Sequence, residues 1–245
     1  MRVRASAEIH PTARVHRAAI LGAGCRVGPH AVVGRSAVVG RECALHAHCV
    51  VAEAAVLGRG AVVREHALVG AGSLLGAGCW VLADAVVGAG CVLGQESLVV
   101  NRARLGERVV LGEGASVGGA SAVAAGVRLG AGCYVGGGSA VLGDVIPHGL
   151  VRDASVLVGL NLVGLRRQGE LRGAALLAFL RAARRCMRAD DARAAAASAA
   201  AEAALRPRCW RLLESVALFA SDAADNGRPL LLMGGGVCAA AENKG

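Results

Sequence analysis

Hydrophobic residues return at every sixth position from the start of the chain to residue 141. Each of these positions holds Val, Leu or Ile, in the order Val3, Ile9, Val15, Leu21, Val27, Val33, Val39, Leu45, Val51, Leu57, Val63, Val69, Leu75, Val81, Val87, Leu93, Val99, Leu105, Leu111, Val117, Val123, Leu129, Val135 and Val141. Four positions after each of them stands a small residue, most often Ala, Cys or Ser. Twenty-four repeats in register are not a chance pattern, and a period of six is typical of a parallel β-helix.

Three hexads complete one triangular coil of 18 residues, so the twenty-four hexads predict eight coils. The aliphatic and the small residue of each hexad then point inward, while the backbone pairs with the next coil at about 4.8 Å. Glycine most often follows the aliphatic residue, as at Gly22 and Gly28, where a side chain would obstruct the corner. The predicted fold class is therefore all-β, a parallel β-helix.

The cysteines follow the same pattern. Six of the nine occupy the small inward position, and they are Cys25, Cys43, Cys49, Cys79, Cys91 and Cys133. The sequence contains no C-x-x-C pair. These cysteines are predicted to pack as small apolar side chains rather than to bind a metal or form disulfides.

The period of six ends after Asp144, and from about Glu170 the apolar spacing becomes helical. Leu171, Leu176, Leu177 and Leu180 mark one helical stripe. Further helices are expected over 192–205 and from Pro207 onward. The predicted domains are a β-helix over residues 1–146, a junction over 147–169 and a small α-helical domain over 170–245.

The net charge of +9 suits an acidic partner, whereas an aromatic content of 2% argues against stacking on nucleic acid. No run approaches the roughly 20 apolar residues of a membrane span, and the N-terminus lacks the apolar core of a signal peptide. The sequence predicts a cytoplasmic protein without a membrane span.

Residues 18 apart should stack on one face of a β-helix, so columns replace linear motifs as the place to look for chemistry. One outward column reads Thr12, His30, His48, His66, Asp84, Arg102, Ala120 and Gly138. His66 followed by Asp84 has the composition of a general base and the carboxylate that orients it, with His48 as a second candidate base. Two other interpretations stay open, namely a metal site between subunits formed by His30, His48 and His66, and a solvated or subunit-contact stripe.

Four stretches resemble one family. They are Ile9-His-Pro-Thr-Ala-Arg-Val15, Leu45-His-Ala-His-Cys-Val-Val51, the pair Arg64-Glu65, and Gly159-Leu-Asn-Leu-Val-Gly-Leu-Arg-Arg-Gln-Gly169. Together they are similar to the bacterial acyl-(acyl-carrier-protein)–UDP-N-acetylglucosamine O-acyltransferases of lipid A biosynthesis. The resemblance implies a left-handed β-helix followed by a helical domain.

The resemblance also implies a function. It predicts a homotrimer that transfers a hydroxyacyl chain from acyl carrier protein to a UDP-amino sugar, with a histidine base and without a cofactor. Asn161 and Arg167, with Arg166 alongside, correspond to the family's nucleotide contacts.

The chain departs from the family at three places. A glutamate expected at 163 is Val163, and the loops that interrupt the family's coils are missing. The family's histidine base falls on Ala89 and its neighbouring aspartate on Gly90, which cannot accept a proton. Three hypotheses therefore remain, namely an acyltransferase whose base is His66 or His48, a catalytically silent paralogue that binds a nucleotide sugar or assembles with the active enzyme, and a metalloenzyme built on the histidine column.

Overall fold

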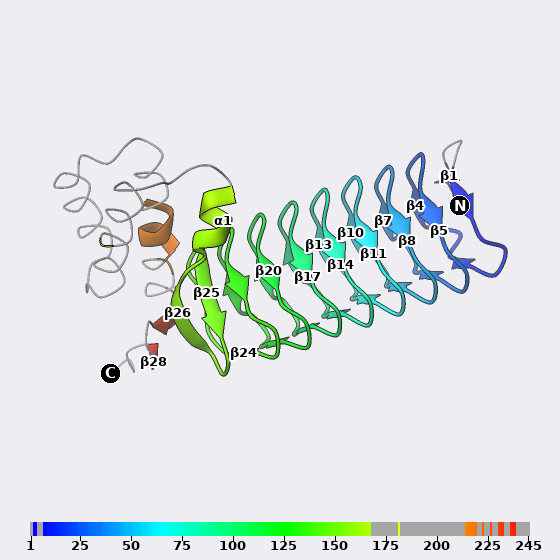
Figure 1. The fold of residues 1–245 in the computed structure, drawn as a ribbon. Helices are drawn as coiled ribbons and strands as arrows, with labels where there is room; N and C mark the ends of the chain where they lie inside the picture. The colour runs from blue at the N-terminus through cyan, green and yellow to red at the C-terminus, as the bar shows by residue number, and fades with distance from the viewer. Residues whose placement is uncertain are drawn as a thin grey trace.

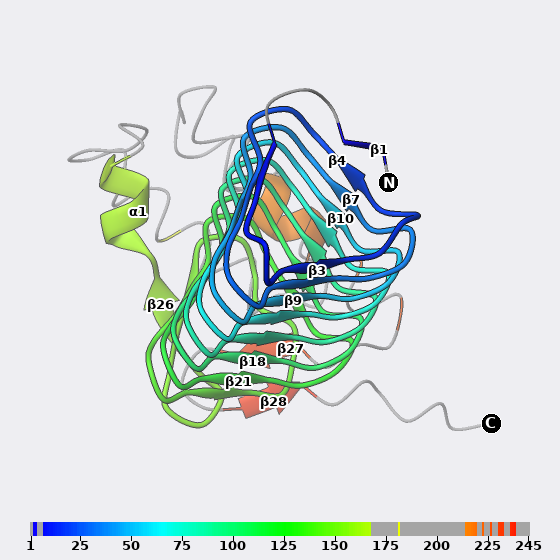
Figure 2. The same ribbon diagram turned by 90° about the vertical axis from the view of Figure 1, so that its right-hand side faces the viewer.

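The structure, a computed structural model, describes residues 2–3, 7–167, 181, 214–219, 222, 226, 230–232 and 236–238. Short strands joined by tight corners wind into a row of stacked coils (Figure 1). Seen along the row, the coils enclose one narrow interior (Figure 2). The architecture is the predicted left-handed parallel β-helix of about eight coils.

Three sheets form the walls. The first holds β1 (Arg2–Val3), β4 (Ile20–Leu21), β7 (Val38–Val39), β10 (Val56–Leu57), β13 (Leu74–Leu75), β16 (Val92–Leu93), β19 (Val110–Leu111) and β22 (Arg128–Leu129). The second holds β2 (Glu8–Ile9), β5 (Arg26–Val27), β8 (Ala44–Leu45), β11 (Val62–Val63), β14 (Trp80–Val81), β17 (Leu98–Val99), β20 (Ser116–Val117), β23 (Tyr134–Val135), β25 (Gly149–Arg152) and β26 (Val156–Leu160). The third holds β3 (Arg14–Val15), β6 (Val32–Val33), β9 (Val50–Val51), β12 (Leu68–Val69), β15 (Val86–Val87), β18 (Arg104–Leu105), β21 (Ala122–Val123) and β24 (Ala140–Val141).

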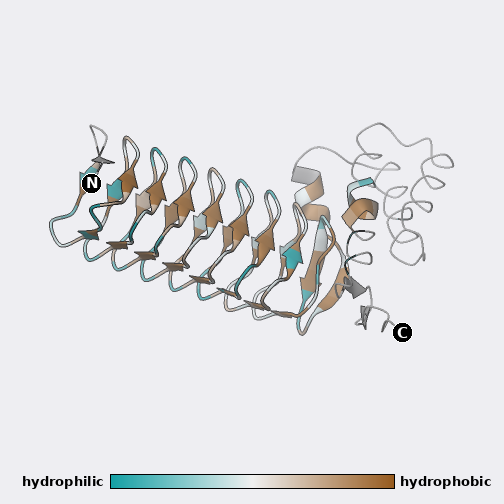
Figure 3. Ribbon diagram, turned by 180° about the vertical axis from the view of Figure 1, so that it is seen from behind, coloured by the Kyte–Doolittle hydropathy of each residue, from teal (hydrophilic) through white to brown (hydrophobic). Residues whose placement is uncertain are grey.

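Each strand from β1 to β24 pairs in parallel with strands one coil away, 18 residues along the chain, as Val56 does with Val38 and Leu74. The register does not slip, because no hexad is longer or shorter than six residues. Most of the strands are apolar, and the turns between them are more polar (Figure 3). Residues 18 apart in the sequence are therefore stacked in rows on adjacent coils, as predicted from the 18-residue period.

The inward residues form the core. The aliphatic column and the small column are both buried from Ala19 onward, and the six cysteines on the small column are free and buried as predicted. Burial raises the pKa of the Cys133 thiol to about 12 and that of Cys43 to about 11. These thiols stay protonated at neutral pH, which agrees with a packing role.

Corners have two demanding positions. At many corners the residue directly after the aliphatic one is a glycine that close approach requires, because a Cβ on Gly112 would lie 2.4 Å from the backbone N of Ala131 in the next coil. The third residue after the aliphatic adopts positive φ in most coils, as at His48, with φ 59°. At this second position side chains are tolerated and point away from the core.

The coil pattern ends in a hairpin. β25 adds to the second sheet in parallel with β23, and β26 returns antiparallel to β25. The helix α1 (Leu162–Arg167) follows directly, and Leu165 on it is fully buried. A two-stranded sheet of β27 (Leu230–Leu232) and β28 (Gly236–Cys238) lies near the C-terminus.

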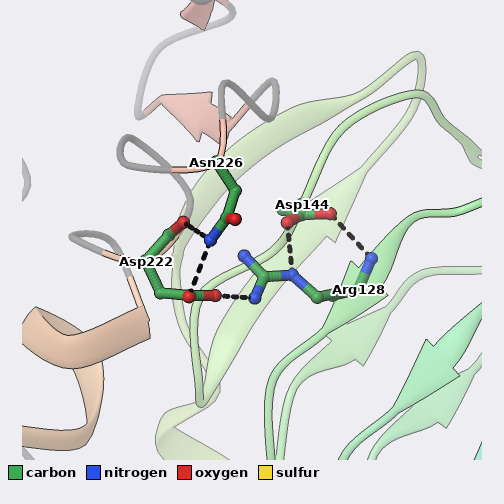
Figure 4. Close-up of polar contacts among 4 residues, drawn as sticks. All are labelled: Arg128, Asp144, Asp222 and Asn226. Carbon is green, nitrogen blue, oxygen red and sulfur yellow. Dashed lines mark hydrogen bonds and ion pairs between the residues drawn. The ribbon is translucent and has the colours of Figure 1, made fainter.

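Arg128 links the last coil to the C-terminal part of the chain (Figure 4). Its Nε donates to Asp144 Oδ2 at 2.7 Å, and its backbone N donates to Asp144 Oδ1 at 2.7 Å. Nη1 of the same guanidinium forms an ion pair with Asp222. The guanidinium carbon of Arg128 lies 4.8 Å from the centre of the Phe219 ring. Burial opposes the charge of Arg128, but the bonds to the two carboxylates outweigh it and raise its pKa.

Residues 214–219 are helical, within the segment predicted to form the third helix, and Val216 and Ala217 on it are buried. The stripe Leu171 to Leu180 and the helix expected over 192–205 lie outside the described residues. Among the described residues, no helix is long and apolar enough to cross a membrane.

Candidate functional site

Three histidines stack along one corner of the β-helix, between the second and third sheets. The ring centroids of His30 and His48 are 4.9 Å apart with an interplanar angle of 14°, and those of His48 and His66 are 4.9 Å apart at 7°. All three are exposed, so the column faces outward as predicted.

Backbone pairing explains why the rings stack. The corner residue of each coil donates its N–H to the preceding coil, from His48 to Pro29 O at 2.9 Å and from His66 to Ala47 O at 3.1 Å. Positive φ costs an L-residue about 1–2 kcal/mol. Ser36, Glu42 and Ala54 accept the same conformation at other corners, so it does not by itself distinguish the histidines as functional.

The predicted partnership of His66 with Asp84 is not formed by a contact in this structure. Asp84 is exposed at the next corner, and its backbone N donates to Glu65 O at 3.0 Å. No ion pair or hydrogen bond joins the two side chains within the described part of the chain. His66 as base and Asp84 as its orienter stay predictions.

The histidine column shows no metal site within the described part of the single chain. Over the described residues, no group of three or more His, Cys, Asp or Glu side chains is arranged to hold an ion. Stacked parallel rings direct their nitrogen lone pairs outward in parallel planes rather than toward one point. The metalloenzyme hypothesis therefore gains no support from the geometry.

An open pocket of about 750 Å³ lies on the second sheet, over the first four coils. Its lining includes the strand residues Ile9, Val27 and Leu45 on β2, β5 and β8, whose side chains point inward, and the polar residues Glu8, His10, Arg26, His46 and Glu65. Arg26 Nε lies 3.6 Å from Glu8 Oε2, with both side chains 78% exposed. This pocket shares a corner with the histidine column but lies on the second-sheet side of it.

A histidine–carboxylate pair closes one side of the pocket. His46 Nδ1 lies 3.1 Å from Glu65 Oε1, and Arg64 Nε donates to Glu65 Oε2 at 3.0 Å. The hydrogen bond from Arg64, together with the nearby charges of Arg64 and His46, lowers the pKa of Glu65 below its usual value. Glu65 is therefore a carboxylate at neutral pH, and its Oε1 accepts a hydrogen bond from Nδ1–H of His46.

The sequence-based search missed this pair. Columns of residues 18 apart do not contain it, because His46 and Glu65 are 19 apart and meet diagonally across two coils. A search for acid–base partners offset by one position from the coil repeat would have found them.

The junction residues have structural roles. Asn161 Oδ1 accepts from the backbone N of Gly164 at 2.9 Å and so caps α1, and its Nδ2 donates to Gly132 O at 3.0 Å. Arg166 and Arg167 lie on α1, but their side chains are not among the described ones. The roles of Asn161, Arg166 and Arg167 as nucleotide contacts remain predictions.

The structure does not bring the histidine column to the junction. Five strand-to-strand steps separate β11, which precedes His66, from β25, which leads into the junction. At about 4.8 Å a step, the separation is about 24 Å. Ala89 and Gly90, where the resemblance places the catalytic pair, lie at another corner, and Gly90 has φ +66°.

His148 is a buried histidine at the junction. It is 6% exposed and lies over Gly132, where an added Cβ would come within 2.5 Å of its Nδ1. Burial lowers the pKa of His148 below its ordinary value of 6.5, because the charged form loses its hydration.

Acidification is expected to destabilise the protein through His148. Below pH 6.5 this imidazole is protonated in the unfolded chain, whereas burial opposes its protonation in the folded chain. The unfolded state therefore binds more protons, and the free energy of unfolding decreases as the pH is lowered. Thermal unfolding about one unit above and one unit below pH 6.5 measures the loss. His148→Asn, which tolerates positive φ, should show a smaller pH effect, and an equal effect in both proteins would contradict the assignment.

Comparisons with known proteins agree with the β-helix. Residues 5–110, less than half of the chain, match the family described as the GMPPB C-terminal domain. No curated protein matches the sequence.

Solved structures match over nearly the whole chain. UDP-N-acetylglucosamine acyltransferase from Campylobacter jejuni is 24% identical with a TM-score of 0.66, and the match covers 86% of this chain and 95% of that one. The Arabidopsis UDP-N-acetylglucosamine acyltransferase is 21% identical with a TM-score of 0.58, covering 91% and 99%. The Francisella novicida UDP-N-acetylglucosamine acyltransferase is 17% identical with a TM-score of 0.53, covering 94% and 93%. These likenesses show a shared fold.

Proposed function

We propose that this protein is a divergent UDP-N-acetylglucosamine O-acyltransferase of lipid A biosynthesis. It transfers a hydroxyacyl chain from the thioester of acyl carrier protein to a hydroxyl of a UDP-amino sugar, in the cytoplasm and as a homotrimer. The observation that carries the proposal is the end-to-end agreement of fold with the UDP-N-acetylglucosamine acyltransferase from Campylobacter jejuni, over 86% of this chain and 95% of that one. The motif from Gly159 to Gly169 supports it independently.

Charge supports the proposed donor. Acyl carrier protein is acidic, and a protein with a net charge of +9 attracts an acidic partner by its overall field. The attraction concerns encounter and orientation rather than the chemistry of transfer.

An apolar stripe on the first sheet supports the proposed trimer. The outward residues of six consecutive strands are all aliphatic, and they are Ile20, Val38, Val56, Leu74, Val92 and Val110. Ile20 is 42% and Leu74 47% exposed in the single chain. A continuous exposed apolar stripe of this kind is typical of a surface that another chain covers.

The proposal is tested by a transfer assay. Purified protein incubated with UDP-N-acetylglucosamine and hydroxyacyl thioesters of acyl carrier protein of several chain lengths should yield an acylated nucleotide sugar, detected by mass spectrometry. Because transfer needs a group that removes the hydroxyl proton, loss of the base should lower the rate by about 10²–10⁴-fold. His66→Ala and His48→Ala test the bases predicted from the sequence, and Arg167→Ala tests the nucleotide contact.

The other outcomes separate the alternatives. Binding of UDP-N-acetylglucosamine without any transfer would favour the silent paralogue over the enzyme. Neither binding nor transfer would contradict the proposed function.

A further inference from the structure

We propose that His46 is the general base for the acyl transfer and that Glu65 is its positioning residue. The inference rests on the proposed function for the reaction class, but it moves the reacting centre to the pocket on the first four coils. The observation that carries it is the contact of 3.1 Å between His46 Nδ1 and Glu65 Oε1 on the rim of that pocket.

The contact fixes the state of the imidazole. The carboxylate of Glu65 can only accept a hydrogen bond, because Arg64 keeps it ionised. Nδ1 of His46 therefore carries a proton, and in the neutral imidazole Nε2 carries the lone pair. In the described part of the chain no side chain or backbone group is bonded to this Nε2. It is free to take a proton from a bound hydroxyl.

The pocket leaves space beside His46. His10 and His46 occupy equivalent corner positions two coils apart, and the residue between them is Gly28, which has no side chain. His10 Nδ1 is engaged with the Thr12 hydroxyl at 2.9 Å. The backbones of His10 and His46 are about 9–10 Å apart across two strand spacings, and both residues line the pocket together with Gly28.

The other charged groups around the pocket are compatible with a nucleotide-sugar acceptor. Arg26 and His46 both line the pocket. The ion pair of Arg26 with Glu8 is exposed, and its N–O distance is 3.6 Å. A phosphate competes well for such a guanidinium, because charge-assisted bidentate bonds to Arg are strong. The remaining charges on this rim, Glu65 and the neighbouring Arg64, are already paired with each other.

The stacked column offers no comparable group. His48 and His66 contact each other through their ring faces, and neither has a carboxylate bonded to it among the described residues. His46 is thus the histidine in the described coils that has both an orienting carboxylate and an adjoining pocket.

The location has a consequence for the acceptor. Six strand-to-strand steps lead from β8, next to His46, to β25, next to the junction. At about 4.8 Å a step they span about 29 Å, more than the length of a nucleotide sugar. An acceptor activated by His46 therefore binds with Arg26, and a nucleotide held at Arg167 of the same chain would lie out of reach of His46.

The step balances without a redox partner. The acceptor O–H gives its proton to His46 Nε2 as the oxygen bonds to the carbonyl carbon of the acyl carrier protein thioester. The C–S bond then breaks, and the imidazolium returns the proton to the leaving sulfur. The products are the ester and the free thiol of the carrier.

The transfer assay with matched variants tests this assignment. His46→Ala and His46→Gln should lower kcat/KM by about 10²–10⁴-fold. The matched control is His16→Ala, since His16 holds the same position in its hexad, is exposed, and has no carboxylate partner among the described residues. Arg26→Ala should raise the KM for UDP-N-acetylglucosamine, and His16→Ala should leave it unchanged.

Glu65→Gln tests the positioning role. It should lower kcat by about 10-fold or more with little change in KM, because an amide can stabilise either tautomer of His46. Imidazole ¹⁵N shifts should show the Nδ1–H form of His46 in the native protein and a mixture in Glu65→Gln. A merely structural role would change neither the tautomer nor kcat.

Failure of this inference differs from failure of the proposed function. Transfer that survives in His46→Ala and is lost in His66→Ala or His48→Ala would overturn the assignment of His46 and keep the function. A native protein that transfers no acyl chain would overturn both.

Discussion

Replacing Leu111 by alanine is expected to lower the free energy of unfolding by about 3 kcal/mol, within the 2–5 kcal/mol typical of buried leucines. Leu111 on β19 is 1% exposed and is stacked in register between Leu93 and Leu129. The coils above and below it are held by continuous backbone pairing, so the cavity cannot collapse easily. Urea unfolding followed by circular dichroism measures the loss.

The control for Leu111→Ala lies on the same strand. Val110 points outward and is 37% exposed, so Val110→Ala should cost no more than about 1 kcal/mol. Equal losses at the two positions would contradict the inward and outward assignment. The two variants should keep the native m-value, because each removes only a few methyl or methylene groups from the buried surface.

Removing the carboxylate of Asp144 is expected to destabilise the protein by about 3–5 kcal/mol, the range measured when one partner of a buried ion pair is lost. The Asp144 side chain is 3% exposed and satisfies both the guanidinium and the backbone N of Arg128. Nη2 of Arg128 is buried without a partner among the described residues, so the arginine has little means of compensation. Thermal and urea unfolding of Asp144→Ala measure the effect.

Two comparisons make the Asp144 result specific. Asp222→Ala should cost less, because the Asp222 side chain is 50% exposed, although limited proteolysis should show a more accessible C-terminal segment. Glu8→Ala removes a largely exposed pair with Arg26 and should change stability by less than about 1 kcal/mol. If Asp144→Ala behaved like Glu8→Ala, the buried pair of Arg128 and Asp144 would not be a stabilising one.

The hexad period was sufficient to predict the coils, because in a β-helix one repeat length sets the strands, the corners and the core together. The inward place of the cysteines and the outward place of the histidines followed from the same period. Positive φ at the histidine corners could not be predicted, since residues as different as Ser36 and Glu42 share that conformation. There the backbone bond to the preceding coil outweighs the local preference of the side chain.

The candidate site was less predictable than the fold. The contact between His46 and Glu65 depends on how side chains lean across neighbouring corners, which a period of 18 does not describe. At the junction, Asn161 was predicted as a ligand contact because of its motif, but its amide is used to cap α1 and to bind Gly132. Sequence similarity locates such a residue without showing which of its hydrogen bonds are already occupied.

The unbroken register also fixes how such a chain can change its length. Adding or removing 18 residues would displace the hairpin of β25 and β26 along the axis by about 4.8 Å and leave every side-chain row in line. Adding or removing six would instead turn everything beyond that point by one face of the triangle, and separate His46 from Glu65 if it occurred between them. The distance between the pocket and the junction can therefore change only in steps of one coil. Only insertions or deletions of whole coils keep every row of side chains aligned on its own face.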